Sequence, residues 1–169
     1  WVSEVPDLAT PRGVAEIIPV LRAIDARFRA SHGVALRMVI IDTLMAAAGI
    51  MDENSNAEAG AVIRNLRKII SELDVTLLGV THTGKNEQVG VRGASAWRAG
   101  ADSVLMISAF RDEKTGHVSD RRIALTKSRV GAEGWGAPFS LKFVRLGEDA
   151  DGADFGACVI EPGQSQEHP

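Results

Sequence analysis

The stretch Met38-Val39-Ile40-Ile41-Asp42-Thr43 decides the fold class, because it holds four consecutive apolar residues followed by an acid. A second apolar run, Val75 to Val80, ends in Thr81-His82-Thr83. Apolar runs without polar alternation are typical of strands buried on both faces, as in a parallel sheet covered by helices. The sequence therefore predicts two central strands whose carboxyl ends carry Asp42 and His82.

Two amphipathic helices are predicted around the first of these strands. Thr10 is an N-cap candidate with Pro11 at the first helical position, and Gly33 can end this helix in the left-handed conformation. Ser55 and Glu58 form a capping box at the start of the second helix. The two apolar stripes are Val14, Ile17, Ile18, Leu21, Ile24 and Phe28, and then Val62, Leu66, Ile69 and Leu73. A helix between two buried strands predicts a parallel βαβ unit.

The carboxyl-terminal third is predicted to be antiparallel β. A glycine-rich loop over residues 84–93 and a short helix from Ala94 to about Ala101 lead to strands expected at residues 104–107, 122–127, 139–146 and 155–160. The predicted fold class is therefore α/β, with a mainly parallel central sheet flanked by helices and an antiparallel carboxyl-terminal third. We expect one domain over residues 1–162 and a polar, disordered tail over residues 163–169.

The composition of the chain limits the classes of protein to which it can belong. The chain has 169 residues, 45% of them hydrophobic, and a net charge of −3. This charge gives no whole-surface attraction to nucleic acid, so such binding would need a local basic patch. The single cysteine, Cys158, excludes an internal disulfide framework. A reducing, cytoplasmic location is expected, and no membrane span or signal peptide is indicated.

Asp42 lies where open α/β sheets bind ligands, outside the carboxyl ends of the strands. A carboxylate there can hold magnesium through water beside the phosphates of a nucleotide. Asp42 could instead only cap the turn that follows. His82 could likewise be a histidine whose hydrogen bonds are satisfied by backbone at a strand end. The residues by themselves leave these interpretations open.

The segment from Gly79 to Asn86 has the spacing of a P-loop, Gly-x-x-x-x-Gly-Lys, and it follows a predicted strand. Its last position is Asn86, which has no hydroxyl for magnesium. No helix is predicted to begin at Lys85, so the aligned amides that cradle phosphate are missing. We therefore do not expect a P-loop at this position.

Five short motifs, in this order, resemble the later motifs of the RecA-like ATPases of the plasmid RepA helicase type. They are Ile40-Ile41-Asp42-Thr43-Leu44, Asp52-Glu53-Asn54-Ser55, Thr81-His82-Thr83-Gly84-Lys85, Arg92-Gly93-Ala94-Ser95-Ala96 and Thr126-Lys127-Ser128-Arg129. The resemblance runs from about Pro6 to Ile160. It implies a RecA-like core in a homo-oligomeric ring, a hexamer in this family, that couples ATP hydrolysis to movement along single-stranded DNA.

By position, the resemblance gives Asp42 the role of the Walker B acid, which holds magnesium through water. His82 matches the residue that senses the γ-phosphate of ATP by a hydrogen bond. Their neighbours Thr43 and Thr81 are counted with the nucleotide-binding residues. Family members often have two adjacent histidines where this chain has Thr81 and His82.

Three basic residues match positions that act between subunits. Arg92 matches an arginine in a flexible loop, either a finger across the subunit interface or a relay of DNA contact. Lys127 and Arg129 match a Lys-x-Arg pair that is projected into the nucleotide of the next subunit. A planar guanidinium suits that task because it can bond two phosphate oxygens at once. Taken singly, Lys127 and Arg129 could instead be outward residues of a β-strand.

Candidates for single-stranded DNA contact are Lys85, Arg92 and Arg98, in or beside the glycine-rich loop. Trp97 could stack on a base, or it could be a core or interface anchor. The acid that activates water has two candidates, Glu4 and Glu53.

The family's P-loop has no counterpart here, and the start at Trp1 suggests a fragment of a longer chain. We therefore expect an ATP-hydrolysing helicase motor in the full-length protein and an inactive enzyme in this fragment. Two alternatives are a non-catalytic oligomerisation or DNA-binding module, and a RecA-like recombinase or regulatory ATPase that does not unwind DNA.

Overall fold

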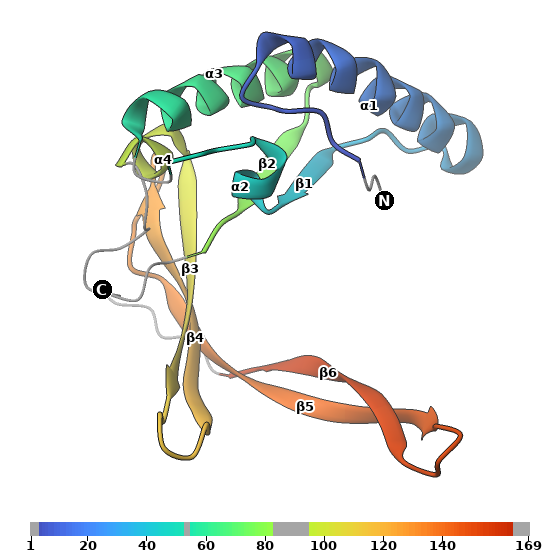
Figure 1. The fold of residues 1–169 in the computed structure, drawn as a ribbon, viewed down its shortest axis with the longest axis vertical. Coiled ribbons are helices and arrows are strands. Elements are labelled where there is room, and N and C mark those ends of the chain that lie inside the picture. The colour runs from blue at the N-terminus through green and yellow to red at the C-terminus, as the bar shows by residue number, and fades with distance from the viewer. Residues whose placement is uncertain (1–3, 53–54, 83–94, 164–169) are drawn as a thin grey trace. The chain divides into compact units, whose positions relative to one another are not determined.

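The computed structural model describes residues 4–52, 55–82 and 95–163. The chain divides into two compact units, Trp1–Gly100 and Ala101–Pro169, which are described separately (Figure 1). The single core expected over residues 1–162 stays a prediction.

The first unit contains the predicted βαβ unit. Its elements are α1 (Pro11–His32), β1 (Met38–Asp42), α2 (Leu44–Ala47), α3 (Asn56–Leu73), β2 (Thr76–Val80) and α4 (Ser95–Gly100). β1 and β2 pair in parallel, with Met38 opposite Thr76 and Asp42 opposite Val80. The prediction of two parallel strands joined through a helix is confirmed.

Helix α1 begins and ends where its sequence signals predict. The Thr10 hydroxyl oxygen accepts a hydrogen bond from the Gly13 amide at 3.0 Å, and Pro11 is the first helical residue. Gly33 takes a left-handed φ of 67° and donates its amide to the Arg29 carbonyl. No helix among the described residues is long and apolar enough to cross a membrane.

Helix α3 confirms one half of the predicted capping box and contradicts the other. The Ser55 hydroxyl oxygen accepts from the Glu58 amide at 3.2 Å, as predicted. The Glu58 carboxylate, however, accepts from the Met51 amide at 3.1 Å, while the Ser55 amide donates to the Asp52 carbonyl. Glu58 therefore fixes the segment that joins α2 to α3, while the Ser55 amide is already bonded to the Asp52 carbonyl of that segment.

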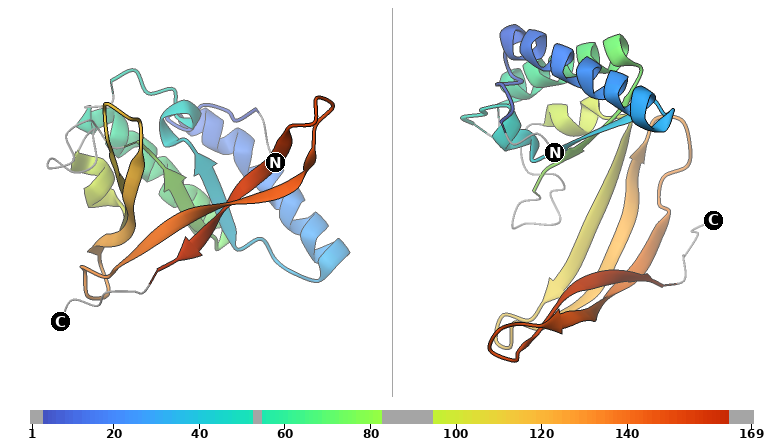
Figure 2. Two further views of the ribbon diagram at one scale, coloured as in Figure 1. Left: turned by 90° about the horizontal axis from the view of Figure 1, so that it is seen from below. Right: turned by 90° about the vertical axis from the view of Figure 1, so that its right-hand side faces the viewer.

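The core lies between α1 and α3 and one face of the two strands (Figures 1 and 2). Among the described residues, every buried apolar side chain of the chain belongs to the first unit: Leu8, Val14, Ile17, Ile18, Leu21, Leu44, Ala48, Ala59, Val62, Leu66, Ile69, Val75 and Trp97. Val39 and Leu77 pack against this core, whereas Met38 and Ile40 are 50% and 61% exposed. The prediction that both faces of these strands are buried is wrong for this unit, because the helices cover only one face.

A short helix that the sequence analysis did not predict, α2, follows β1. Its Leu44 side chain packs against Gly79 of β2, where an added Cβ would lie 2.5 Å from Leu44 Cδ1. The Leu8 amide donates to the Ala47 carbonyl at 3.0 Å, which holds the other end of α2. Gly79, the first glycine of the P-loop-like spacing, therefore lies inside β2, where it allows Leu44 to pack closely.

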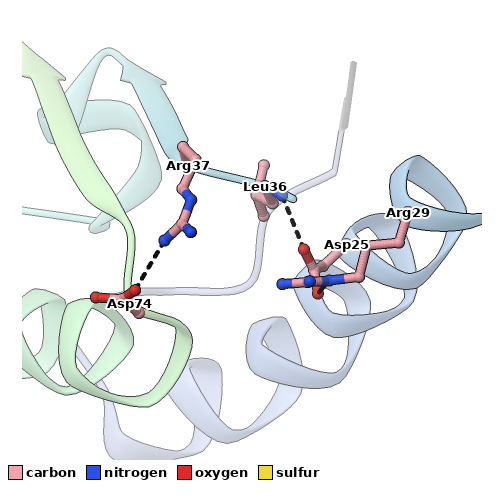
Figure 3. Close-up of polar contacts among 5 residues, drawn as sticks. All are labelled: Asp25, Arg29, Leu36, Arg37 and Asp74. Atoms are coloured by element: carbon pink, nitrogen blue, oxygen red, sulfur yellow. Dashed lines mark hydrogen bonds and ion pairs between the residues drawn. The ribbon is translucent and has the colours of Figure 1, made fainter. Parts of the chain in front are cut away.

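Polar contacts tie the entry to β1 to both long helices (Figure 3). The Asp25 carboxylate of α1 accepts from the Arg29 guanidinium at 2.7 Å and from the Leu36 amide at 2.8 Å. Arg37 forms an ion pair at 2.8 Å with Asp74, the left-handed residue that ends α3. The hydrogen bonds from Arg29 and then Leu36 hold the pKa of Asp25 below its ordinary value.

The second unit is a four-stranded antiparallel sheet in the order β3-β4-β5-β6. Its strands are β3 (Ser103–Arg111), β4 (Val118–Ser128), β5 (Gly136–Glu148) and β6 (Asp154–Pro162), each longer than the sequence predicted. The antiparallel carboxyl-terminal third is confirmed. The described residues thus form a mixed α/β structure in which one strand pair is parallel, and a complete RecA-like core is not evident among them.

We predict that Asp25→Asn makes the free energy of unfolding less dependent on pH in the acid range. A folded-state pKa below the unfolded value gives stability that is present above the unfolded pKa and is lost as pH falls through the folded pKa. Urea unfolding of the full chain from pH 7 downward should show the gap between wild type and Asp25→Asn closing as acid protonates Asp25. Glu113→Gln, in the exposed β3–β4 turn, is the control; a gap that is constant over pH would contradict the prediction.

We predict that Gly79→Ala destabilises the chain by about 1–3 kcal/mol, because the new methyl group would overlap Leu44 and displace α2. Gly60→Ala is a matched control inside α3, where the nearest atom to an added Cβ is at 3.6 Å. That control should stabilise the helix by about 0.5–1 kcal/mol. Chemical denaturation measures both, and equal effects of the two substitutions would refute the packing role of Gly79.

Candidate functional site

Four predicted site residues meet at one edge of the β1–β2 pair. Asp42 ends β1 and Thr43 follows it, while Thr81 and His82 come directly after β2. The register that places Asp42 opposite Val80 brings both pairs to the carboxyl edge of the sheet (Figure 1). Asp42 and His82 are exposed, and Thr43 and Thr81 are half-buried.

Thr43 has a structural role as well as its predicted one. Its hydroxyl oxygen accepts from the Ala46 amide at 3.3 Å and so caps α2. The hydroxyl O–H is not used in that bond and can still donate a hydrogen bond to a ligand. The peptide bond between Asp42 and Thr43 is cis. The Thr43 hydroxyl caps the turn after β1, and the Asp42 carboxylate is exposed to solvent.

The exposed carboxylate of Asp42 fits the chemistry of a magnesium site that is completed by a nucleotide. Mg²⁺ keeps several waters and is commonly held by one or two carboxylates together with substrate phosphates. Asp42 supplies one such carboxylate at a ligand-accessible edge. Within residues 4–52, 55–82 and 95–163, no three His, Cys, Asp or Glu side chains gather as metal ligands.

Helix α4 positions Arg98 and Trp97. Asn56, at the start of α3, accepts from the Ser95 hydroxyl at 3.2 Å and from the Ala96 amide at 3.1 Å. Trp97 is only 7% exposed and belongs to the core, so the structure favours the core anchor over the stacking platform. Arg98 is exposed on the same short helix. The predicted DNA contact of Arg98 stays a prediction.

Lys127 and Arg129 lie in the second unit, at the carboxyl end of β4 and just beyond it. The Lys127 ammonium donates to the Ala101 carbonyl at 2.8 Å. The Arg129 guanidinium lies 2.9 Å from the Asp102 carboxylate, and its amide donates to the Asp102 carbonyl at 2.9 Å. Both residues therefore hold the segment that leads into β3.

Three of the predicted positions, Lys85, Arg92 and Glu53, lie outside the described residues. Glu4 is exposed on the segment that precedes α1. The residues that the sequence analysis missed are those that support the edge: Leu44 and Gly79, which pack together, and Leu8, whose amide anchors α2. The run of good helix formers after Thr43, Leu-Met-Ala-Ala-Ala, was a signal for α2.

Comparison with known proteins gives one family assignment. A family model described as an AAA domain matches residues 2–88. The matched region includes the βαβ unit with Asp42 and His82, and it ends before β3, so Lys127 and Arg129 lie outside it. A search of curated proteins finds no match. Because the model matches more than half of the chain, the chain belongs to the AAA domain family, a family of ATPase-type domains.

Proposed function

We propose that the chain is the carboxyl-side portion of a RecA-like ATPase motor from a RepA-like replicative DNA helicase, or from a related phage or plasmid replication protein. One observation carries the proposal. Two parallel strands in register present an acid and a histidine at the same carboxyl edge, Asp42 after β1 and His82 after β2. That edge is where open α/β sheets bind nucleotides. Membership of the AAA domain family supports the use of a nucleotide and a metal in general terms.

In this proposal each residue at the edge has a separate role toward ATP. Bound magnesium would neutralise charge on the β- and γ-phosphates. Asp42 would hold that ion through water, as its exposed carboxylate permits. His82 would donate a hydrogen bond to the γ-phosphate, so its position would report whether the phosphate is present. The hydroxyl groups of Thr43 and Thr81 would donate hydrogen bonds to the nucleotide beside His82.

The remaining basic residues would act between subunits of a homo-oligomeric ring and on DNA. Lys127 and Arg129, or Arg92, would reach the nucleotide of the next subunit, where a guanidinium stabilises charge on the transferred phosphate. Lys85, Arg92 and Arg98 would contact the phosphates of single-stranded DNA, with binding that weakens as salt rises. A cytoplasmic location accords with this role.

We predict that Asp42→Asn in the full-length protein lowers single-stranded-DNA-stimulated ATP hydrolysis by about 10²-fold or more, because the amide holds magnesium poorly. Glu16→Gln on exposed α1 is the control and should leave turnover unchanged. Strand displacement by the wild type, lost in Asp42→Asn, would support a helicase. Hydrolysis without strand displacement would favour a recombinase or regulatory ATPase. No hydrolysis in the wild type would favour a non-catalytic module.

We predict that Arg129→Ala spares ATP binding and lowers turnover by roughly 10³-fold, as loss of a trans arginine finger does. Asp102→Ala is the matched control, because it removes the same ion pair and keeps the guanidinium. If Arg129 only anchors the segment before β3, the two variants should lose activity equally. Steady-state ATPase assays with fluorescent-nucleotide titrations separate these outcomes.

A further inference from the structure

The edge strand β6 is unusually open. β6 pairs with β5 alone in its sheet, and all nine residues of Asp154–Pro162 are exposed. Its interior, Phe155 to Ile160, carries no charge and no proline. Charged residues, prolines and bulges are the usual devices that prevent an edge strand from pairing with another chain. The six interior positions, Phe155 to Ile160, lack the first two of these devices, which occur in β6 only at its ends, as Asp154, Glu161 and Pro162.

The sheet that β6 borders has no buried apolar side chain among its described residues, in contrast to the first unit. Leu141, Phe143 and Ile160 are exposed on one face of the β5–β6 ribbon, where Leu141 lies opposite Ile160 and Phe143 opposite Cys158. An apolar hollow of about 370 Å³ continues this face over Phe139 and Ile123. A two-stranded ribbon is marginally stable by itself. Further pairing at β6 would widen this ribbon and give the β6 side chains on this face, such as Ile160, new cross-strand neighbours.

The backbone of β6 has donors and acceptors available at its free edge. The Gly163 amide donates to the Pro138 carbonyl of β5 at 2.8 Å. Because amide directions alternate along a strand, the amides of Glu161, Val159 and Ala157 also point to β5. Those of Ile160, Cys158 and Gly156 point to the free edge by the same alternation. Cys158 is the central residue of this set and of β6 itself.

Charge does not oppose the approach of an identical strand. Glu161 forms an ion pair at 3.1 Å with Lys142, and Asp154 forms one with Arg145, both across the β5–β6 ribbon. In an antiparallel pair of β6 strands centred on Cys158, Asp154 would lie opposite Pro162 and Glu161 opposite Phe155. No like charges would face each other, and each carboxylate would keep its own cation from β5.

We propose that the free edge of β6 is a dimerisation surface whose partner is β6 of a second copy of this chain. The two strands pair antiparallel about a twofold axis at Cys158, so that the joined sheet runs β5-β6-β6-β5. This register pairs all nine residues of each strand, and a shift in either direction shortens the overlap. Because the same edge is used on both copies, the contact is isologous and closes at two copies.

The single cysteine reports the register directly. In the proposed dimer Cys158 lies opposite Cys158 of the second copy, at a Cα separation of about 5.5 Å. A disulfide can span that distance. Diamide should therefore link the two chains, taking two electrons and two protons from the two thiols. Ala157→Cys in a Cys158→Ser background places the thiols on a diagonal at roughly 7–8 Å, too far apart for efficient linking.

The experiment uses the full chain. Light scattering and sedimentation over a series of concentrations should show a monomer–dimer equilibrium, and non-reducing gels should show a diamide-linked dimer. Ile160→Pro removes an amide that points to the free edge, and proline is tolerated on an edge strand in that position. Loss of the two symmetry-related hydrogen bonds should weaken dimerisation by about tenfold or more. Ile160→Thr keeps the amide and the preference for a strand, so it is the matched control and should retain the dimer.

Circular dichroism and thermal unfolding serve as controls that test whether each variant is folded before its assembly is compared. A monomer at every concentration, open-ended growth of the assembly, or equal linking through Ala157→Cys would overturn the proposal. A dimer or ring that Ile160→Pro leaves unchanged would also overturn it, because such an assembly uses another surface. Assembly through the nucleotide edge would respond to Asp42→Asn instead, so failure of this inference is distinguishable from failure of the proposed function.

Discussion

The parallel pairing of β1 with β2 is the constraint on which the candidate site depends. Parallel neighbours need a long connection, and α3 provides it: its 18 residues span ~27 Å and run back over both strands. Burial of Val62, Leu66 and Ile69 holds α3 in place, at about 1.5–3 kcal/mol for each side chain. With the connection fixed, the carboxyl ends of both strands must meet at one edge. A slip of one residue would exchange the buried and exposed faces of a strand, so the core also fixes the register of Asp42 and His82.

Elements with local signals were predictable from the sequence. Thr10, Pro11 and Gly33 set the ends of α1 because their preferences depend only on neighbouring backbone. The Ser55 cap was predictable for the same reason. The hydrogen bond of the Glu58 side chain was not predictable, because the choice between the Ser55 and Met51 amides depends on where the preceding segment folds. An apolar run shows which residues can be buried; it does not show which face the helices cover, and Ile40 is therefore exposed in spite of its pattern.

Arg129 shows why the candidate site was only partly predictable. Asp102 is 27 positions away in the sequence, and no local pattern indicates that the two form an ion pair. An exposed ion pair of this kind contributes about 0–1 kcal/mol. That energy is small enough for the guanidinium to exchange Asp102 for a phosphate, which carries more charge and accepts two parallel hydrogen bonds. A local contact to Asp102 and a role toward nucleotide are therefore compatible for Arg129.

The two units are stabilised in different ways, and this affects how each responds to substitution. The first unit depends on side-chain burial, so loss of a methyl group from Val62 or Ile69 leaves a cavity that its close-packed neighbours cannot fill. The described part of the second unit depends on backbone ladders, with its apolar side chains on open faces. In the second unit, loss of a methyl group leaves no cavity. A proline breaks the ladder where it replaces a residue whose amide donates to a neighbouring strand. The exposed apolar side chains of Leu141, Phe143 and Ile160 thus contribute little to the isolated sheet. Pairing at the free edge would give the side chains of β6, Ile160 among them, cross-strand neighbours on a second copy, which is the physical basis for placing an interface at this edge.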